Sequence, residues 1–285
     1  MSSLNNYLWD TSLPLFKLEG ADCRTFLNSQ TTFDVLRIKE GTIFRTCWLS
    51  PVGRFKALLE GKMVGGCIEF VVLLGDSQEL IDGLNKVIFP VDRVNVIACD
   101  QVRRLQIISM NQSWKETATQ WLSNKEKTPQ SFLEIKAASK TILQEWKIKQ
   151  GLPDRINHII QKCNPFEIGL SDFVDLEKGC YLGQETLSKV KNMGNLKHQL
   201  RFFEYEGKLN SDEKLILSSE NGEKNSSENG GFVFSSMLSG DNNTIGLAMI
   251  RRRFSSYDNL KLGEARKRMK IKIPLGFKGI DDIKT

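Results

Sequence analysis

The stretch "DLEKGCYLGQETLSK", residues 175–189, sets a cysteine between two glycines directly before a helix-like run. The run from Gln184 to Met193 has a glutamate in its first turn and lysines towards its end, and Gly194 follows it. This pattern predicts a helix with Gly183 at its N-cap. The residues before Gly183 then form a tight loop whose backbone N–H groups lie beside the positive end of that helix. Such a loop favours an anion, a carboxylate or the electron-rich atoms of a heterocycle.

Cys180 is the candidate reactive thiol of the chain. It follows Lys178 closely and precedes the predicted helix, and both a cation and a helix N-terminus stabilise a thiolate. A nucleophilic or sulfur-handling role needs that thiolate, so Lys178 is a candidate supporting residue. The residues alone leave an alternative open, in which the glycines serve only the backbone, Tyr181 packs, and Cys180 fills a corner.

The other cysteines are expected to be reduced, because the chain has no C-x-x-C pair and is long enough to be stable without disulfides. Four of them are expected to be small buried hydrophobes, namely Cys23, Cys47, Cys67 and Cys99. Cys163 and Cys180 have no further cysteines at ligand spacing, so no metal site is predicted. The only histidines are His158 and His198, which argues against a zinc site or a Ser-His-Asp triad.

The composition predicts a soluble globular protein of two or three domains. The chain has 285 residues, of which 40% are hydrophobic and 26% charged, enough apolar material for a large core. The longest apolar run, "FVVLL" at 70–74, falls far short of the roughly 18 residues of a membrane helix. The first residues show no basic n-region and no Arg-rich amphipathic pattern, so no signal or transit peptide is expected. We therefore expect a cytoplasmic location and no membrane partner.

Strand-like and helix-like segments interleave irregularly before residue 195, without a repeated βαβ pattern or a Gly-x-Gly-x-x-Gly run. An α+β fold is therefore expected, not a doubly wound one. Strands are expected within 42–50, 53–62, 67–75 and 93–109. A short helix leading into a loop is expected within 23–38, and further helices are expected at 76–89 and 111–125.

The last part of the chain predicts a small all-β domain. Strand-like runs occur at 196–206, 231–237, 244–254 and 269–275. Between the first two, "SSENG" occurs twice in a segment poor in apolar residues, which predicts a mobile loop at about 207–231. We therefore expect domains at 1–194 and 195–285.

The basic clusters at 251–253 and 267–272 could face nucleic acid, an anionic ligand or only water, and such clusters most often mark a solvated strand edge.

The octapeptide "KGCYLGQE", residues 178–185, resembles the diagnostic Lys-Gly-Cys-Tyr/Phe-x-Gly-Gln-Glu run of the folate-binding YgfZ proteins, which are relatives of the glycine-cleavage T-protein. Further elements of that family are matched in chain order at 26–35, 49–55, 147–154, 164–180 and 246–252. The likeness spans roughly residues 15 to 275, which an accidental octapeptide would not do.

The resemblance implies a T-protein-like ring of three modules around a central channel that holds tetrahydrofolate or a derivative. The first two modules would be α+β and intertwined within 1–194, and the last would be a β-barrel. The resemblance also implies an accessory role in the assembly or repair of iron–sulfur clusters, with Cys180 as the working residue and client or assembly proteins as partners. Two alternatives stay open: a folate-dependent one-carbon (aminomethyl) transferase, and a nucleic-acid or protein-binding module that uses the late basic clusters.

The residues expected at the site combine the loop with matched positions elsewhere in the chain. The candidate catalytic residues are Cys180 and Lys178. The candidate folate-binding residues are Gln30, Thr32, Asp34, Trp48, Tyr181, Gln184, Glu185 and Lys189. Each has a structural alternative: the first three form a helix-to-strand turn, Trp48 and Arg54 flank the next turn, Tyr181 packs, and Gln184 and Glu185 begin the helix.

Two departures from the T-protein bear on the reaction. Lys149 stands where the T-protein has an acidic residue for the pterin ring, and an ammonium group cannot accept the N–H donors of a pterin. No aspartate for methylene transfer lies in the matching run, although Glu79 and Asp82 are near it. Aminomethyl transfer of the T-protein type is therefore not expected. Lys189 stands where the family often has arginine, which replaces a bidentate fork by a point charge.

Overall fold

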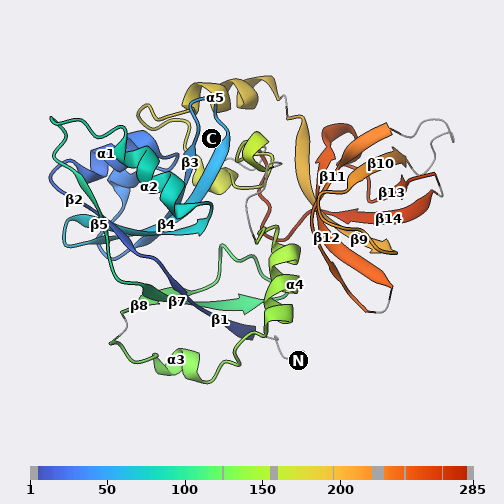
Figure 1. Ribbon diagram of the computed structural model, residues 1–285, viewed down its shortest axis with the longest axis horizontal. Helices are drawn as coiled ribbons and strands as arrows, with labels where there is room; N and C mark the ends of the chain where they lie inside the picture. Colours follow the sequence, from blue (N-terminus) through green and yellow to red (C-terminus); the bar gives the residue numbers. More distant parts are fainter. Residues whose placement is uncertain are drawn as a thin grey trace.

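The computed structural model describes residues 6–123, 125–154, 160–194, 196–219, 228–240, 242–264 and 266–280. Three groups of strands lie around a common centre, with helices between and outside them (Figure 1). Two groups are open antiparallel sheets in the first half of the chain, and the third is a closed barrel in the last third. The predicted α+β class and C-terminal barrel are confirmed. The division of the chain after residue 194 stays a prediction.

The larger open sheet has five strands in the order β3-β4-β5-β2-β6. Their bounds are β2 Phe16–Glu19, β3 Ile43–Leu49, β4 Phe55–Val64, β5 Cys67–Leu74 and β6 Asn95–Ala98. Helices α1 (Cys23–Gln30) and α2 (Ser77–Asn85) share one apolar core with this sheet. The short helix expected within 23–38 and the helix expected at 76–89 are thus confirmed, although the second ends at Asn85, and each presents apolar side chains to the sheet.

The smaller open sheet has the order β1-β7-β8, with β1 at Asn6–Leu13, β7 at Val102–Ser109 and β8 at Thr119–Leu122. The short helix α3 (Gln130–Leu133) adds Phe132 to the core of this sheet. The prediction of a helix at 111–125 is wrong, because β8 occupies part of it. Trp121 of β8 is buried and pairs in register with Arg104 of β7, and this tertiary packing outweighs the local helical pattern.

Six strands close the barrel in the order β10-β11-β12-β9-β14-β13. Their bounds are β9 His198–Glu206, β10 Lys214–Ser219, β11 Glu228–Leu238, β12 Asn243–Arg251, β13 Asn259–Leu262 and β14 Lys267–Lys272. Strand β10 lies inside the segment expected as a loop. That expectation is corrected here, because Leu215 and Leu217 alternate into the barrel core and are fully buried. Residues 220–227 of that segment lie outside the described residues.

The centre of the molecule is built from α4 (Lys140–Gln150), α5 (Gln184–Met193), the short turns η2 (Ile160–Lys162) and η3 (Ser171–Phe173), and residues 274–280. The last of these segments runs back from the barrel into the centre (Figure 1). Gly276 lies against the indole of Trp114, where an added Cβ would be 2.4 Å from the ring. The Leu275 N–H donates to the Lys149 carbonyl at 2.9 Å, which ties this segment to the end of α4.

The four cysteines that were expected to be buried differ in their exposure. Cys23 and Cys47 are buried as expected, whereas Cys67 is half-buried and Cys99 is exposed. The expectation for Cys99 is wrong because it directly follows β6, an edge strand with little cover. Within the described ranges, no helix is both long and apolar enough to cross a membrane. In the same ranges no group of three or more histidine, cysteine and carboxylate side chains could hold a metal ion.

Candidate functional site

The loop at residues 178–183, which carries Cys180, packs directly against the turn at residues 50–53. Helix α5 begins and ends as predicted, with Gly183 at its N-cap and Gly194 at its C-cap, both at positive φ. A Cβ on Gly183 would lie 2.9 Å from the Ser50 carbonyl oxygen and 3.0 Å from the Gly53 Cα. A Cβ on Gly53 would lie 2.9 Å from the Cβ of Thr186. The two loops, far apart in sequence, can therefore approach this closely only as glycines.

Lys178 anchors the loop to the end of α1. Its Nζ donates to the Asn28 carbonyl at 2.5 Å, to Asn28 Oδ1 at 3.1 Å and to the Phe33 carbonyl at 2.8 Å. An ammonium group has three N–H donors, so these acceptors use its full capacity. Burial lowers the pKa of Lys178 to about 8, although Asp34 and Asp175 act in the opposite direction. The role of Lys178 as a partner of the Cys180 thiol stays a prediction.

Gln184 braces the loop from inside. Its Oε1 accepts from the Tyr181 N–H at 3.2 Å, and its Nε2 donates to the carbonyls of Leu176 at 3.1 Å and Lys178 at 3.2 Å. Because both ends of the amide are engaged, Gln184 could read a pterin edge only by releasing the loop. The contacts favour a positioning role for this side chain.

Cys180 is exposed at the surface of the braced loop, whereas its neighbour Tyr181 is buried. The Tyr181 ring packs in the central core under the Lys178 ammonium, 4.9 Å from the ring centroid. Burial raises the pKa of Tyr181, and its hydroxyl has no hydrogen-bond partner among the described residues. Farther along α5, Glu185 and Lys189 pair with each other at 2.6 Å on the exposed face of the helix.

The residues expected from the segment 26–35 have structural partners. Thr32 is fully buried, and its hydroxyl donates to the Phe173 carbonyl at 2.5 Å and accepts from the Cys47 N–H at 3.0 Å. Asp34 caps the short helix η1 (Val35–Arg37) by accepting from the Leu36 N–H at 3.1 Å. The structural alternative, a helix-to-strand turn, describes these contacts.

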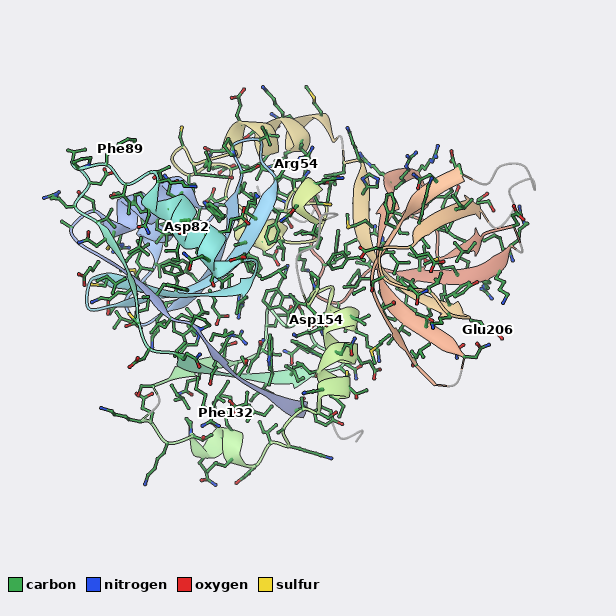
Figure 2. All side chains as sticks on the ribbon, in the orientation of Figure 1. Arg54, Asp82, Phe89, Phe132, Asp154 and Glu206 are labelled. Atoms are coloured by element: carbon green, nitrogen blue, oxygen red, sulfur yellow. The ribbon has the colours of Figure 1, made fainter. Side chains whose placement is uncertain are left out.

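The other two expected residues of this region, Gln30 and Trp48, also have structural contacts. Gln30 is half-buried and donates from Nε2 to the Ser29 hydroxyl at 3.1 Å. The Trp48 ring lies against Gly83 of α2, where a Cβ would be 2.4 Å from it. Arg54 is exposed beneath α5 (Figure 2). The structure therefore gathers Thr32, Asp34, Lys178 and Tyr181 behind the loop, in packing contacts.

A cavity with a volume of about 510 Å³ lies between α2 and the segment after α4. Its lining residues are Lys56, Leu73, Leu74, Gly75, Asp76, Ser77, Glu79, Asp154 and Gln161. Asp154 lies near the centre of the molecule in Figure 2. None of the ten expected site residues lines this cavity, although Glu79 was noted as a carboxylate near the matching run. Residue Lys149, by contrast, pairs with Glu145 at 2.6 Å on α4 and does not line it.

A narrow slot of about 50 Å³ adjoins the cavity and shares Leu73, Leu74 and Asp154 with it. The slot is also lined by Trp9, Leu58, Arg104, Trp114, Lys147, Leu152 and Pro153. Ion pairs stand at the rim of the combined site: Lys56 with Glu79 at 2.7 Å, and Lys147 with Asp154 at 2.8 Å. The site thus combines a mixed-charge opening with an aromatic inner end.

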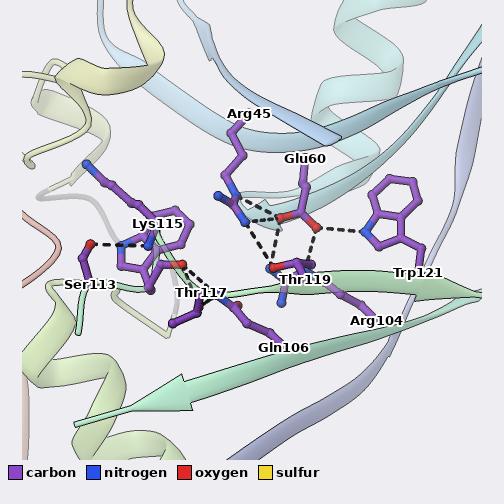
Figure 3. Close-up of polar contacts among 10 residues, drawn as sticks. Arg45, Glu60, Arg104, Gln106, Ser113, Lys115, Thr117, Thr119 and Trp121 are labelled. Atoms are coloured by element: carbon purple, nitrogen blue, oxygen red, sulfur yellow. Dashed lines mark hydrogen bonds and ion pairs between the residues drawn. The ribbon is translucent and has the colours of Figure 1, made fainter. Parts of the chain in front are cut away.

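A buried charge network forms the floor of the slot. Arg104 binds the Glu60 carboxylate in a bidentate pair at 2.7 and 3.0 Å, and Arg45 approaches the same carboxylate at 2.8 Å (Figure 3). The Trp121 indole N–H donates to Glu60 at 2.9 Å. Burial alone would raise the pKa of Glu60, but the two guanidinium groups and the indole outweigh it and lower the pKa to about 2.

The two indoles that line the slot are held by cations. The Arg104 guanidinium lies 5.0 Å from the Trp9 ring centroid and the Lys147 ammonium lies 5.1 Å from it. Arg45 lies 4.9 Å from the Trp114 ring centroid. Sequence reasoning missed this group, although the polar Arg104 and Gln106 at alternate positions, on the same face of a β-rich run, were a usable signal.

Comparisons with known proteins give the fold. No family model matches the chain. An uncharacterized protein of Haemophilus influenzae is 24% identical over 229 residues, which are 76% of this chain and 78% of that protein. A putative chloroplastic transferase of Arabidopsis thaliana is 23% identical over 226 residues, covering 65% of this chain and 52% of that protein, so the match spans about half its length.

A crystal structure of the glycine cleavage system aminomethyltransferase T from Bartonella henselae superposes with a TM-score of 0.64 over 97% of this chain and 88% of that one, at 12% identity. The chain therefore has the fold of the glycine cleavage T-protein, as the sequence resemblance implied.

Proposed function

We propose that the protein binds a reduced folate, tetrahydrofolate or a derivative, with its ring system at the slot and its tail towards the opening. The observation that carries this proposal is the cavity of about 510 Å³ that ends between two indoles. Ligand sites of about 300–1,000 Å³ hold molecules of this size. The T-protein fold and the resemblance of "KGCYLGQE" to the folate-binding YgfZ signature support the same ligand class.

The chemistry of the walls suits the two ends of a folate. Leu73, Leu74 and the indole of Trp114 offer an apolar surface to a flat ring. Lys56 at the opening carries an ammonium group that can bind a carboxylate of the glutamate tail, after exchange with its present partner Glu79.

In the fuller form of the proposal, the protein is an accessory factor for the assembly or repair of iron–sulfur clusters in other proteins. Cys180 then supplies a thiol to a client or an assembly protein. Its exposure on a loop fixed by Gln184 supports this role, because the thiol can reach a second protein without opening the fold. The thiol and the folate would act at separate places, since Cys180 does not line the cavity.

Isothermal titration with tetrahydrofolate under reducing conditions tests the folate proposal. The wild type should bind saturably, and Leu73→Trp, which fills the wall shared by cavity and slot, should bind at least tenfold more weakly. Leu133→Trp, at an exposed position of α3, is the matched control and should bind like the wild type. Lack of saturable binding to the wild type at millimolar ligand would reject the proposal.

The cluster-related proposal is tested in cells that lack the native protein. Cys180→Ala should lower the activities of iron–sulfur enzymes, whereas Cys99→Ala, which removes the other exposed thiol, should restore them like the wild type. Full restoration by Cys180→Ala with intact folding would leave the thiol without a role.

One-carbon transfer is a second candidate because the carboxylates of Asp76, Glu79 and Asp154 line the cavity and can accept a proton from an amine. Formation of methylenetetrahydrofolate from candidate amines would support it. Against it stands that Lys149, at the position of the acidic residue of the T-protein, pairs with Glu145 and does not line this cavity, so that position supplies no acceptor for a pterin here.

A further inference from the structure

The network under the slot holds more positive than negative charge. Arg45 and Arg104 share the single carboxylate of Glu60, and the side chains of these residues are 11%, 0% and 0% exposed. Two buried guanidinium groups against one carboxylate leave a net charge of +1. A buried cation is retained at low cost only when an opposite charge or a strong acceptor faces it.

Arg104 also has unused hydrogen-bonding capacity. Its Nε and Nη2 donate to the two oxygens of Glu60, whereas its Nη1 is buried without a hydrogen-bond partner in the described ranges of the chain. Arg104 lines the slot. Buried donors in native proteins nearly always have an acceptor, so this atom points to a ligand group.

We propose that Arg104 is a specificity-determining residue of the folate site: its Nη1 donates to the 4-oxo oxygen of the pteridine ring. This inference rests on the proposed function. A slot of about 50 Å³ admits a small ring substituent while the ring itself lies at the mouth of the slot, against Leu73 and Leu74, which line both the slot and the cavity. An oxygen acceptor satisfies the buried N–H, whereas an amino group at the same position would set donor against donor.

The ring oxygen fits the slot better than a tail carboxylate does. Apart from Arg104 and the Lys147–Asp154 ion pair, the slot is walled by the indoles and by apolar side chains such as Leu58, Leu73 and Leu74. A carboxylate there would have to shed its hydration beside these apolar groups and compete with Asp154 for Lys147, while Lys56 offers it a charged partner at the opening.

The test compares tetrahydrofolate with its 4-amino-4-deoxy analogue, which has the same tail. The wild type should bind the 4-oxo ligand about 10- to 100-fold more tightly, the range expected for one hydrogen bond from a charged group. Arg104→Gln should reduce this preference to less than about threefold. In this variant Arg45 and Glu60 still form an ion pair with no net charge, so circular dichroism should show a native fold.

Arg45→Gln is the matched control. It removes the same charge from Glu60 and leaves the bidentate Arg104 pair, and Arg45 does not line the slot. This variant should keep the preference for the 4-oxo ligand. The wild type alone gives a second measurement, because tail-free tetrahydropterin and its 4-amino analogue should show the same ratio if the ring oxygen occupies the slot.

Equal affinity of the wild type for the two ligands would overturn the inference while leaving folate binding in place. An unchanged ratio in Arg104→Gln, or loss of the ratio with tail-free ligands, would also overturn it. Failure of the wild type to bind either ligand would instead reject the proposed function itself.

Discussion

Gly53 and Gly183 meet in direct backbone contact, so that a Cβ on Gly183 would lie 3.0 Å from the Cα of Gly53. The contact joins the turn before β4 to the loop that carries Cys180. Since both glycines also have positive φ, the approach of these two loops depends on the absence of side chains at two positions.

Gly183→Ala should destabilise the protein by about 2 kcal/mol or more, because it combines positive φ with a close approach to the Ser50 carbonyl. Urea unfolding measures this change. Gly179→Ala in the same loop is the control: a Cβ there meets nothing within 4 Å, so the expected effect is below about 0.5 kcal/mol. If both substitutions lowered the free energy of unfolding equally, the close contact of Gly183 with the turn at residues 50–53 would be wrong.

Glu60→Gln should cost about 3–5 kcal/mol of folding free energy, because it leaves two buried guanidinium groups without a counter-charge. Thermal and urea unfolding both report this loss. Glu185→Gln removes a carboxylate from an exposed pair and should leave the unfolding midpoint unchanged. A small effect of Glu60→Gln would show that water reaches the network.

The pH dependence of stability should show the low pKa of Glu60. The folded value of about 2 lies below the ordinary 4.5, so the unfolded chain binds more protons in this window. The contribution is therefore present in full above pH 4.5 and is lost as the pH falls towards 2. Acid titration followed by fluorescence should show a shallower loss of stability for Glu60→Gln than for the wild type over that range.

Lys178 should also make stability rise with pH, but in the alkaline range. Its folded pKa of about 8 lies below the ordinary 10.5, so the unfolded chain holds more protons between these values and stability gains with rising pH. Between pH 8 and 10.5, Lys178→Met should show a less positive slope of unfolding free energy against pH than the wild type. Lys189→Met, on the exposed face of α5, should keep the wild-type slope. Identical slopes in all three proteins would mean that Lys178 is hydrated.

Alkylation of the native protein should separate the cysteines by access. Cys180 and Cys99 are exposed and should be modified within minutes by iodoacetamide at pH 8. Cys47 and Cys163 should react only after unfolding, because burial raises the pKa of each thiol to about 12. Peptide mapping by mass spectrometry gives the order of labelling, and protection of Cys180 would contradict its placement at the surface.

Features encoded by neighbouring residues could be predicted from the sequence. Helix α5 begins and ends at the predicted residues because its caps, Gly183 and Gly194, are local signals. The strand-like runs after residue 195 predict an all-β domain, whereas its closure into a barrel follows only from the family resemblance. The prediction failed for β8. There the pairing of Trp121 with Arg104 on β7 outweighs the local helical pattern.

The cavity could not be predicted in the same way. Its inner end joins Trp9 to Trp114, and its floor joins Glu60 to Arg104, residues that are far apart in the sequence. No local rule relates the members of such pairs. For Lys178 and Gln184 the sequence indicated the right loop, but it could not show that their polar groups face the backbone instead of solvent.

The path of residues 274–280 bears on the order in which the molecule forms during synthesis. The two open sheets are complete once residue 122 has been made, yet Trp114 and Gly169 receive Gly276 and Phe277 only after all the barrel strands. A nascent chain therefore carries an unclosed apolar centre through most of its translation. Ribosome-bound chains that stop before residue 274 should bind chaperones that recognise exposed hydrocarbon, and release them once this segment emerges.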